Sequence, residues 1–340
     1  MSDTRDKFEL NENGIPNFDR LPLRKGDPML AAWGLYGDND ELGTLNRLTD
    51  ARVAAAARSE IRTGIRVSMN WPLNAQEKGS FFNRRLFHQE MFAKPPRTVN
   101  DDIWTFNSQC SSQWDGLRHF GYQKERKFYN GVTMDDIHAC DVETGEKSTV
   151  NGIQAWAEKG IVGRGVLVDY NSWRLAQGYD EKINVADAFA TTPISAADLK
   201  ACLAAQGTEV RFGDVLLVRS GWMAAHASKT EAEIKALQAE FSQHRFVGLE
   251  QSEEMLRWIW ESFSAVAGDQ PSLECWPTQK DWSLHEVLLS GWGCPIGELF
   301  HLEKLAEECR RLNRWSFFVA SEPCNVEGGV ASPPNILAIF

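Results

Sequence analysis

The stretch "DVLLVRSGW", residues 214–222, decides the fold class of this 340-residue chain. Its short, uninterrupted run of apolar side chains is the pattern of a strand that is buried on both faces of a sheet. The same pattern recurs at "RGVLVDY" (164–170), "FSAVAGD" (263–269), "RWSFFVAS" (314–321) and "NILAIF" (335–340). Because helical stretches separate these strands, the sequence predicts an α/β protein with a sheet at its core and helices on its flanks.

Helical patterns occupy five of the segments around these strands. They lie at 48–64, 193–207, 229–243, 250–262 and 298–313. Thr49 or Asp50 is expected to cap the first of these helices, and Gly64 lies just past its expected end.

The remaining segments predict a simple domain organisation. Residues 65–74 alternate and predict a further strand, whereas residues 75–100 show no clear period and predict a long irregular excursion. No internal repeat or low-complexity linker appears. We therefore expect an irregular N-terminal arm over residues 1–28 and a single domain over residues 29–340.

Composition and charge exclude several classes of function. The net charge of −11 argues against nucleic acid as a partner, because phosphate binding needs clustered Lys and Arg. The seven cysteines form an odd number without a C-x-x-C pair, which favours reduced thiols in an intracellular protein. The N-terminus is polar, and no apolar run approaches the roughly 20 residues that span a bilayer. We expect a cytoplasmic, soluble protein that acts on a small molecule and not at a membrane.

The stretch "SSQWDGLRHFGY", residues 111–122, is the first candidate for chemistry. In a strand, Gln113 and Asp115 point to one face and Trp114 to the other, and Gly116 then permits a turn that returns His119 toward Asp115. A carboxylate, an imidazole and an amide oxygen on one rim suit a divalent ion such as Mn²⁺ or Zn²⁺. A structural hydrogen bond between the Asp and the His is the simpler alternative.

A second candidate cluster lies near the C-terminus. His285 stands among apolar residues, and Glu298 stands at the start of a predicted helix. Taken separately, they suit a histidine at the edge of the core, with Glu286 solvated beside it, and a first-turn carboxylate at a helix dipole. A metal site would need ligands from both clusters, and these are residue types that would complete it.

The stretch "QCSSQWDGLRH", residues 109–119, can be laid on the signature H-x-G-T-H-x-D-x-P-x-H. Through it the chain resembles the cyclase superfamily of metal-dependent hydrolases, which includes bacterial kynurenine formamidase and isatin hydrolase. Asp115 and His119 fall on the Asp and the last His of the signature, whereas Gln109 and Gln113 replace its first two His residues. Stretches such as "FYNGVT" (128–133), "AGDQPSLE" (267–274) and "LHEVLL" (284–289) extend the resemblance, toward a subgroup with "QWDG", over nearly the whole chain from Trp33 onward.

The resemblance implies a metal site, a fold and an assembly. The implied ligands are Gln113, Asp115, His119, His285 and Glu298, around one divalent ion, Mn²⁺ or Zn²⁺, with a second metal possible. The neutral amide of Gln113 shifts the preference toward Mn²⁺. The implied fold is a swivelling β/β/α domain that forms homodimers or homotetramers, with active sites near subunit interfaces.

The position of the family's catalytic histidine, four residues after the last signature His, is Gln123 in this chain. Glutamine cannot act as a general base, although it can orient water or substrate. A metal-activated water, or the carboxylate of Asp115 or Glu298, must then serve as the base.

The resulting prediction is a metal-dependent hydrolase of an amide, lactam or lactone in a small cyclic or aromatic molecule. Trp104, Phe120 and Trp222 are candidates to flank a flat substrate. Two alternatives stay open. One is a metal-dependent cyclase or dehydratase, and the other is a catalytically lapsed oligomer that binds a small molecule.

Overall fold

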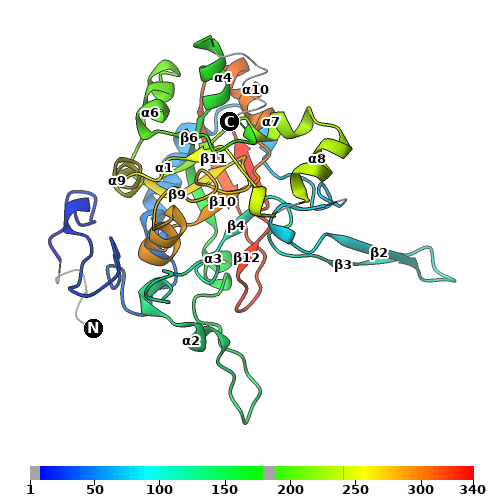
Figure 1. The fold of residues 1–340 in the computed structure, drawn as a ribbon, viewed down its shortest axis with the longest axis horizontal. Coiled ribbons are helices and arrows are strands. Elements are labelled where there is room, and N and C mark those ends of the chain that lie inside the picture. Colours follow the sequence, from blue (N-terminus) through cyan, green and yellow to red (C-terminus); the bar gives the residue numbers. More distant parts are fainter. Residues whose placement is uncertain (1–7, 78, 179–187, 240) are drawn as a thin grey trace.

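The computed structural model describes residues 8–77, 79–178, 188–239 and 241–340, which form an α/β protein built on a mixed sheet (Figure 1). In the described residues this sheet has nine strands, in the order β1-β13-β11-β5-β7-β9-β10-β4-β12. Their bounds are β1 (Arg66–Ser68), β4 (Gln113–Asp115), β5 (Ile161–Val168), β7 (Asp214–Val218), β9 (Phe263–Gly268), β10 (Ile296–Glu298), β11 (Ser316–Ser321), β12 (Ala331–Ser332) and β13 (Ile336–Ile339). A further parallel pair joins β6 (Pro193–Ile194) to β8 (Gly248–Leu249).

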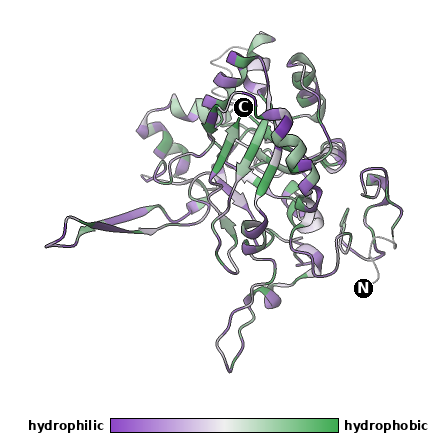
Figure 2. Cartoon of the chain, turned by 180° about the vertical axis from the view of Figure 1, so that it is seen from behind, coloured by the Kyte–Doolittle hydropathy of each residue, from purple (hydrophilic) through white to green (hydrophobic). Residues whose placement is uncertain are grey.

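The centre of the sheet consists of the parallel strands β5, β7 and β9. Every residue of β7 and β9 is buried, and Figure 2 shows these central strands as strongly hydrophobic. A strand covered on both faces has no solvated side on which polar residues could alternate, so it requires a continuous apolar run. The prediction from residues 214–222 is therefore confirmed.

Helices surround the sheet, and the five predicted helical segments all contain one. Among the described residues, the α-helices are α1 (Asp50–Glu60), α2 (Met134–His138), α3 (Gln154–Lys159), α4 (Tyr170–Ala176), α6 (Ala196–Ala205), α7 (Trp222–Ala227), α8 (Glu231–Gln238), α9 (Glu253–Ser262) and α10 (Glu303–Leu312). Thr49 is the N-cap of α1, because its hydroxyl accepts the backbone N–H of Arg52 at 3.3 Å. The helix ends at Glu60, earlier than predicted from Gly64. No helix in these described ranges is long and apolar enough to cross a membrane.

The N-terminal segment contains the 3-10 turn η2 (Phe18–Arg20) and packs on α9. Phe18 is buried, and the indole of Trp260 donates to the carbonyl of Pro16 at 2.9 Å. The division of the chain into an arm and one domain stays a prediction.

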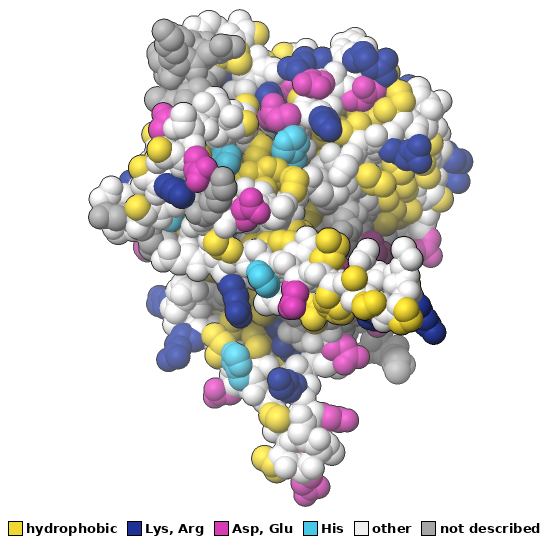
Figure 3. Space-filling view, turned by 90° about the vertical axis from the view of Figure 1, so that its right-hand side faces the viewer, with side chains coloured by type: hydrophobic (Ala, Val, Ile, Leu, Met, Phe, Trp, Pro, Cys, Tyr) yellow, Lys and Arg dark blue, Asp and Glu magenta, His cyan; other side chains and the backbone are white. Residues whose placement is uncertain are grey.

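The predicted irregular excursion over residues 75–100 is wrong in its second half. There β2 (His88–Ala93) begins a two-stranded hairpin with β3 (Asn100–Thr105), which projects from the body (Figure 1). The hairpin leaves Met91, Ile103 and Trp104 more than half exposed, and Figure 3 views the molecule from the side on which it projects. The sequence showed no alternation here because neither face of the hairpin packs on the core of its own chain.

Glu298 is also placed differently from its prediction. It is the last residue of β10, whereas α10 begins only at Glu303. Leu299 turns the chain between these two elements with φ of +54°. The apolar pattern of this segment suits a buried strand as well as a helix, so periodicity could not separate them.

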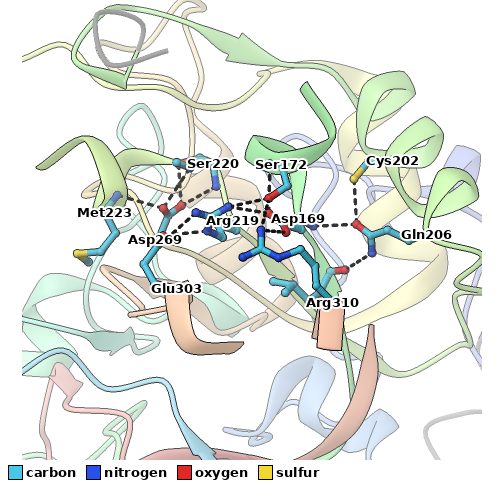
Figure 4. A network of polar contacts seen from close by, with 12 residues as sticks. Asp169, Ser172, Cys202, Gln206, Arg219, Ser220, Met223, Asp269, Glu303 and Arg310 are labelled. Carbon is cyan, nitrogen blue, oxygen red and sulfur yellow. Dashed lines mark hydrogen bonds and ion pairs between the residues drawn. The ribbon is translucent and has the colours of Figure 1, made fainter. Parts of the chain in front are cut away.

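An ion-pair network covers the carboxyl ends of the parallel strands (Figure 4). Arg219 directly follows β7; its Nη1 donates to Asp169 at 2.8 Å, and its Nε and Nη2 donate to Glu303 at 2.8 and 2.6 Å. Asp269 follows β9 and accepts the backbone N–H groups of Ser220 and Met223 at 2.6 and 3.1 Å. These contacts tie the strand ends to α7 and α10, so the usual ligand-binding edge of a parallel sheet is filled by structural side chains.

Candidate metal centre

The antiparallel pair β4 and β10 forms the floor of the candidate site. Its register places Gln113 opposite Glu298 and Asp115 opposite Ile296. Since side chains two apart share a face, Gln113 Nε2 lies 3.3 Å from Asp115 Oδ1 and donates to Glu298 Oε2 at 2.9 Å. Trp114 points to the other face and packs edge-on against Phe300. The predicted division of this strand into two faces is confirmed.

A turn after β4 returns His119 to Asp115. The backbone N–H of His119 donates to the carbonyl of Gly116 at 3.0 Å. A Cβ at position 116 would lie 2.7 Å from the carbonyl oxygen of Val330, so this close approach requires glycine. The turn leaves His119 Nε2 3.9 Å from Asp115 Oδ2, with about a fifth of the histidine side chain exposed, at 21%.

His285 comes from the far end of the chain and reaches the same carboxylate. It caps the π-helix η7 (Glu286–Gly291). Its Nε2 lies 3.9 Å from Asp115 Oδ2 and 3.2 Å from Glu298 Oε1, and its Nδ1 lies 2.5 Å from Glu274 Oε2. One donor atom each from Asp115, His119 and His285 lies within 4.8 Å of the other two. The fold thus brings the two predicted clusters together.

The donor set fits a divalent cation. Asp115 Oδ2 is buried and has no hydrogen-bond partner among the described residues, which is costly for a carboxylate oxygen. Both histidine Nε2 atoms face it at 3.9 Å, too long for a hydrogen bond. A cation between the three atoms would satisfy all of them, and imidazole and carboxylate together suit Mn²⁺ or Zn²⁺.

Burial and crowding shift the protonation of these groups. Burial lowers the pKa of His119, against the opposing charge of Asp115. For His285, burial is outweighed by Glu274 and Glu298, which raise its pKa well above the ordinary value. Burial, followed by the charge of Asp115, raises the pKa of Glu298. The positive charge of a divalent ion beside Asp115 would favour the ionised form of Glu298.

Three residues that the sequence reasoning did not assign complete the cluster. Glu274 holds His285, and Gln109 Nε2 donates to Asp115 Oδ1 at 2.6 Å. Arg84 Nη1 donates to Gln113 Oε1 at 3.0 Å. Gln109 and Glu274 lie in stretches that carry the family resemblance, whereas Arg84 lies in a segment without any pattern.

The orientation of the Gln113 amide bears on its predicted role as a ligand. A guanidinium can only donate, so the amide oxygen faces Arg84 and the NH₂ group faces Asp115 and Glu298. In this orientation Gln113 donates to the carboxylates, and a role as a metal ligand would require its amide to turn over.

The other predicted site residues lie at varying distances from the cluster. The ring of Phe120 is 5.5 Å from that of His285 and 6.2 Å from that of His119. Gln123 is exposed, and its side chain donates to the carbonyl of Gly121 at 2.8 Å. Its backbone N–H donates to the carboxylate of Glu286 at 2.7 Å.

Two further expectations differ from the structure. Glu286 is buried, with 7% exposure, and not solvated as expected. Trp222 is fully buried and stacks on His226, with ring centroids 4.9 Å apart. The described contacts of Trp222, and those of Trp104 on the projecting hairpin, do not reach the cluster.

Comparison with known proteins gives one family and several solved structures with a similar fold. The model of a family described as putative cyclase matches residues 65–275. A solved structure described as a novel cyclase is 30% identical, covers 91% of this chain and 99% of its own, and has a TM-score of 0.76. Isatin hydrolase A from Ralstonia solanacearum is 13% identical over 85% of this chain and 97% of its own, with a TM-score of 0.51. Isatin hydrolase A from Labrenzia aggregata, bound to benzyl benzoate, is 13% identical over 87% and 98%, with a TM-score of 0.53. No curated protein matches the sequence.

Proposed function

The chain belongs to the putative cyclase family, and on that premise we propose that it is a metal-dependent hydrolase. Its substrate would be an amide, lactam or lactone in a small cyclic or aromatic molecule. The observation that carries this proposal is the convergence of Asp115, His119 and His285 on one point, with a buried and unsatisfied carboxylate oxygen among them. The isatin hydrolases share the fold at 13% identity, and their name makes isatin a compound to test.

The side chains of this chain have distinct roles in the proposed reaction. Asp115, His119 and His285 would hold a divalent ion, which would lower the pKa of a water molecule and polarise the scissile carbonyl. Glu298 is the candidate to accept a proton from the attacking water. The backbone N–H of Leu273 donates to Glu298 Oε1 at 3.0 Å and fixes the carboxylate. Burial and the charge of Asp115 raise the pKa of Glu298, which makes its carboxylate a stronger proton acceptor than an exposed one.

The surroundings support an aromatic or cyclic substrate. Phe120 lies against both histidine rings, and a flat substrate that enters beside the partly exposed His119 would pass over it. Gln123 stands where a catalytic histidine is expected from the resemblance, and it cannot act as a base. We therefore expect N-formylkynurenine to be a poor substrate.

One observation favours a second candidate function, a catalytically lapsed protein that binds a small molecule. Gln109 and Gln113 both donate to Asp115 Oδ1, so one oxygen of the central carboxylate is satisfied without a metal. Metal analysis separates the two candidates.

The test starts from protein purified without added metal. We expect about one divalent ion per chain, lost in Asp115→Ala and in His285→Ala and kept in the control His138→Ala, since His138 is exposed on α2. The loaded protein is then assayed with isatin, N-formylkynurenine and aromatic lactones. A folded protein that binds neither Mn²⁺ nor Zn²⁺ and hydrolyses none of these compounds would refute the proposal.

A further inference from the structure

Arg84 is the cation nearest to the floor of the metal centre that the proposed reaction does not use. Its Nη1 donates to the carbonyl of Gln109 at 2.9 Å and to Gln113 Oε1 at 3.0 Å. Gln113 in turn donates to Glu298. A single amide therefore separates the guanidinium from the candidate general base, and the side chain is only half-buried.

The backbone before Arg84 is held in an unfavourable conformation. Phe82 and Asn83 are consecutive non-glycine residues with φ of +60° and +54°. This left-handed conformation is unfavourable for a residue with a Cβ, and such strain tends to occur at ligand-binding positions. The hydroxyl of Ser80 donates to the carbonyl of Arg84 at 2.6 Å and closes the turn. The ring of Phe82 lies 5.5 Å from the guanidinium carbon. The turn therefore fixes where the guanidinium stands.

The guanidinium keeps unused donors. Within the described residues, the hydrogen bonds of the Arg84 side chain all come from Nη1, and no carboxylate forms an ion pair with it. Two buried arginines form ion pairs, Arg164 with Glu60 and Arg219 with Glu303. Another, Arg118, uses Nε, Nη1 and Nη2 on backbone carbonyls, so it has no unused edge of this kind. Nε and Nη2 of Arg84 have no hydrogen-bond partner among the described residues, and neither atom is buried, so both face accessible space.

A charge-balancing role alone does not explain this arrangement. An arginine that served to neutralise Asp115 and Glu298 would contact them, because Coulomb attraction falls with distance. Here the amide of Gln113 stands between them and Arg84. The free edge of a guanidinium, formed by Nε and Nη2, matches the two oxygens of a carboxylate in a bidentate pair.

We propose that Arg84 forms a carboxylate-binding subsite beside the metal centre. The enzyme thereby selects substrates that carry a carboxylate close to the bond that is cleaved, and Arg84 acts as a specificity residue. The carboxylate pairs with Nε and Nη2, while Nη1 stays on Gln109 and Gln113. This inference rests on the proposed function for its choice of substrates, although the binding of the carboxylate itself can be measured without turnover.

The binding test uses two probes that differ by one carboxylate, benzoate and phthalate. Affinities are measured by calorimetry on the Mn²⁺-loaded protein and on the chelator-treated protein. We expect phthalate to bind about 10- to 100-fold more tightly than benzoate, as one charge-assisted bidentate pair implies. Arg84→Gln should abolish this preference and Arg84→Lys, which keeps the charge, should reduce it. The matched control Arg85→Gln removes the same charge from the neighbouring exposed position and should keep it.

The outcomes separate this inference from the proposed function. If the protein binds no metal but still prefers phthalate through Arg84, the proposed function fails and the subsite stands. If the wild type binds both probes equally, or if folded Arg84→Gln and Arg84→Lys both keep the full preference, the subsite is refuted whatever the metal content.

Kinetics give a second readout once a neutral substrate is found. Arg84→Gln should lower the ratio of kcat/KM for a carboxylate-bearing lactone to kcat/KM for the corresponding neutral lactone about tenfold or more, mainly through the KM of the carboxylate-bearing lactone. An equal loss for both lactones would mean that Arg84 acts on the reacting carbonyl or on the fold, and it would overturn the assignment.

Discussion

Replacement of Glu274 by glutamine tests the metal centre from outside its predicted ligands. The Glu274 carboxylate is buried, and it lies 2.5 Å from His285 Nδ1. It therefore keeps a proton on Nδ1, so that Nε2, which lies beside Asp115 and Glu298, is the atom that would bind the metal. Glutamine keeps the size and one acceptor oxygen but removes the negative charge that makes the imidazole a stronger ligand.

The expected magnitude follows from this geometry. Loss of an outer hydrogen-bond partner of a metal-bound histidine weakens metal affinity about 10- to 100-fold, or about 1.4 to 2.7 kcal/mol. Glu274→Gln should fall in that range for both Mn²⁺ and Zn²⁺. Glu286→Gln is the matched control, because Glu286 is also buried next to His285 in the sequence but accepts from Ser283 and Gln123 instead.

The assay is a competition titration of chelator-treated protein against a metal indicator, with circular dichroism to establish that each variant is folded. The control should stay within about threefold of the wild type, since no contact to a predicted ligand is lost. A folded Glu274→Gln protein with wild-type affinity would show that His285 does not bind metal through Nε2 under the control of Glu274.

Three further predictions concern pH, stability and assembly. Burial lowers the pKa of His226 to about 4 from the ordinary 6.5. Because His226 takes up a proton at a higher pH in the unfolded chain than in the folded one, the free energy of unfolding should be constant in this respect above pH 6.5 and fall by up to about 3 kcal/mol as the pH approaches 4. Urea titrations should find this fall reduced in His226→Phe. Arg219→Met should lower the free energy of unfolding by about 3–5 kcal/mol, because it removes the hydrogen-bonded partner of the buried Asp169 carboxylate and the bidentate partner of Glu303. Arg310→Met changes a half-exposed side chain of the same network and should cost less than about 1 kcal/mol. Equal losses from the two variants would contradict this reasoning. We propose that the β2–β3 hairpin packs on a second copy of the chain, because an isolated hairpin with exposed apolar side chains is marginally stable. Light scattering should find a dimer or tetramer that dissociates in the double variant Ile103→Asp, Trp104→Asp. A monomeric wild type at micromolar concentration would contradict this proposal.

Much of the fold follows from local patterns. Continuous apolar runs identified β5, β7, β9, β11 and β13. The strands β7 and β9 are covered on both faces, as such a run indicates, whereas β13 is not, because Leu337 is exposed. The family assignment and the α/β class are confirmed. The hairpin β2–β3 was missed because its residues do not pack on the core of their own chain and so follow no burial pattern.

The candidate site was foreseeable only in part. The spacing of Gln113 and Asp115 placed them on one face, since alternation is a property of any strand. Glu298 was expected in a helix, and only its pairing with Gln113 across β4 and β10 shows why it faces the cluster.

The sequence by itself therefore determined the class of the fold, because apolar runs are local, and it indicated the family and most candidate ligands through the resemblance that its motifs carry. The tertiary structure alone decided which oxygen of Asp115 is unsatisfied, that Glu274 directs His285, and that Arg84 turns the amide of Gln113. These features arise between segments far apart in the chain, where distance and hydrogen-bond direction follow from how the strands pair and not from any local pattern.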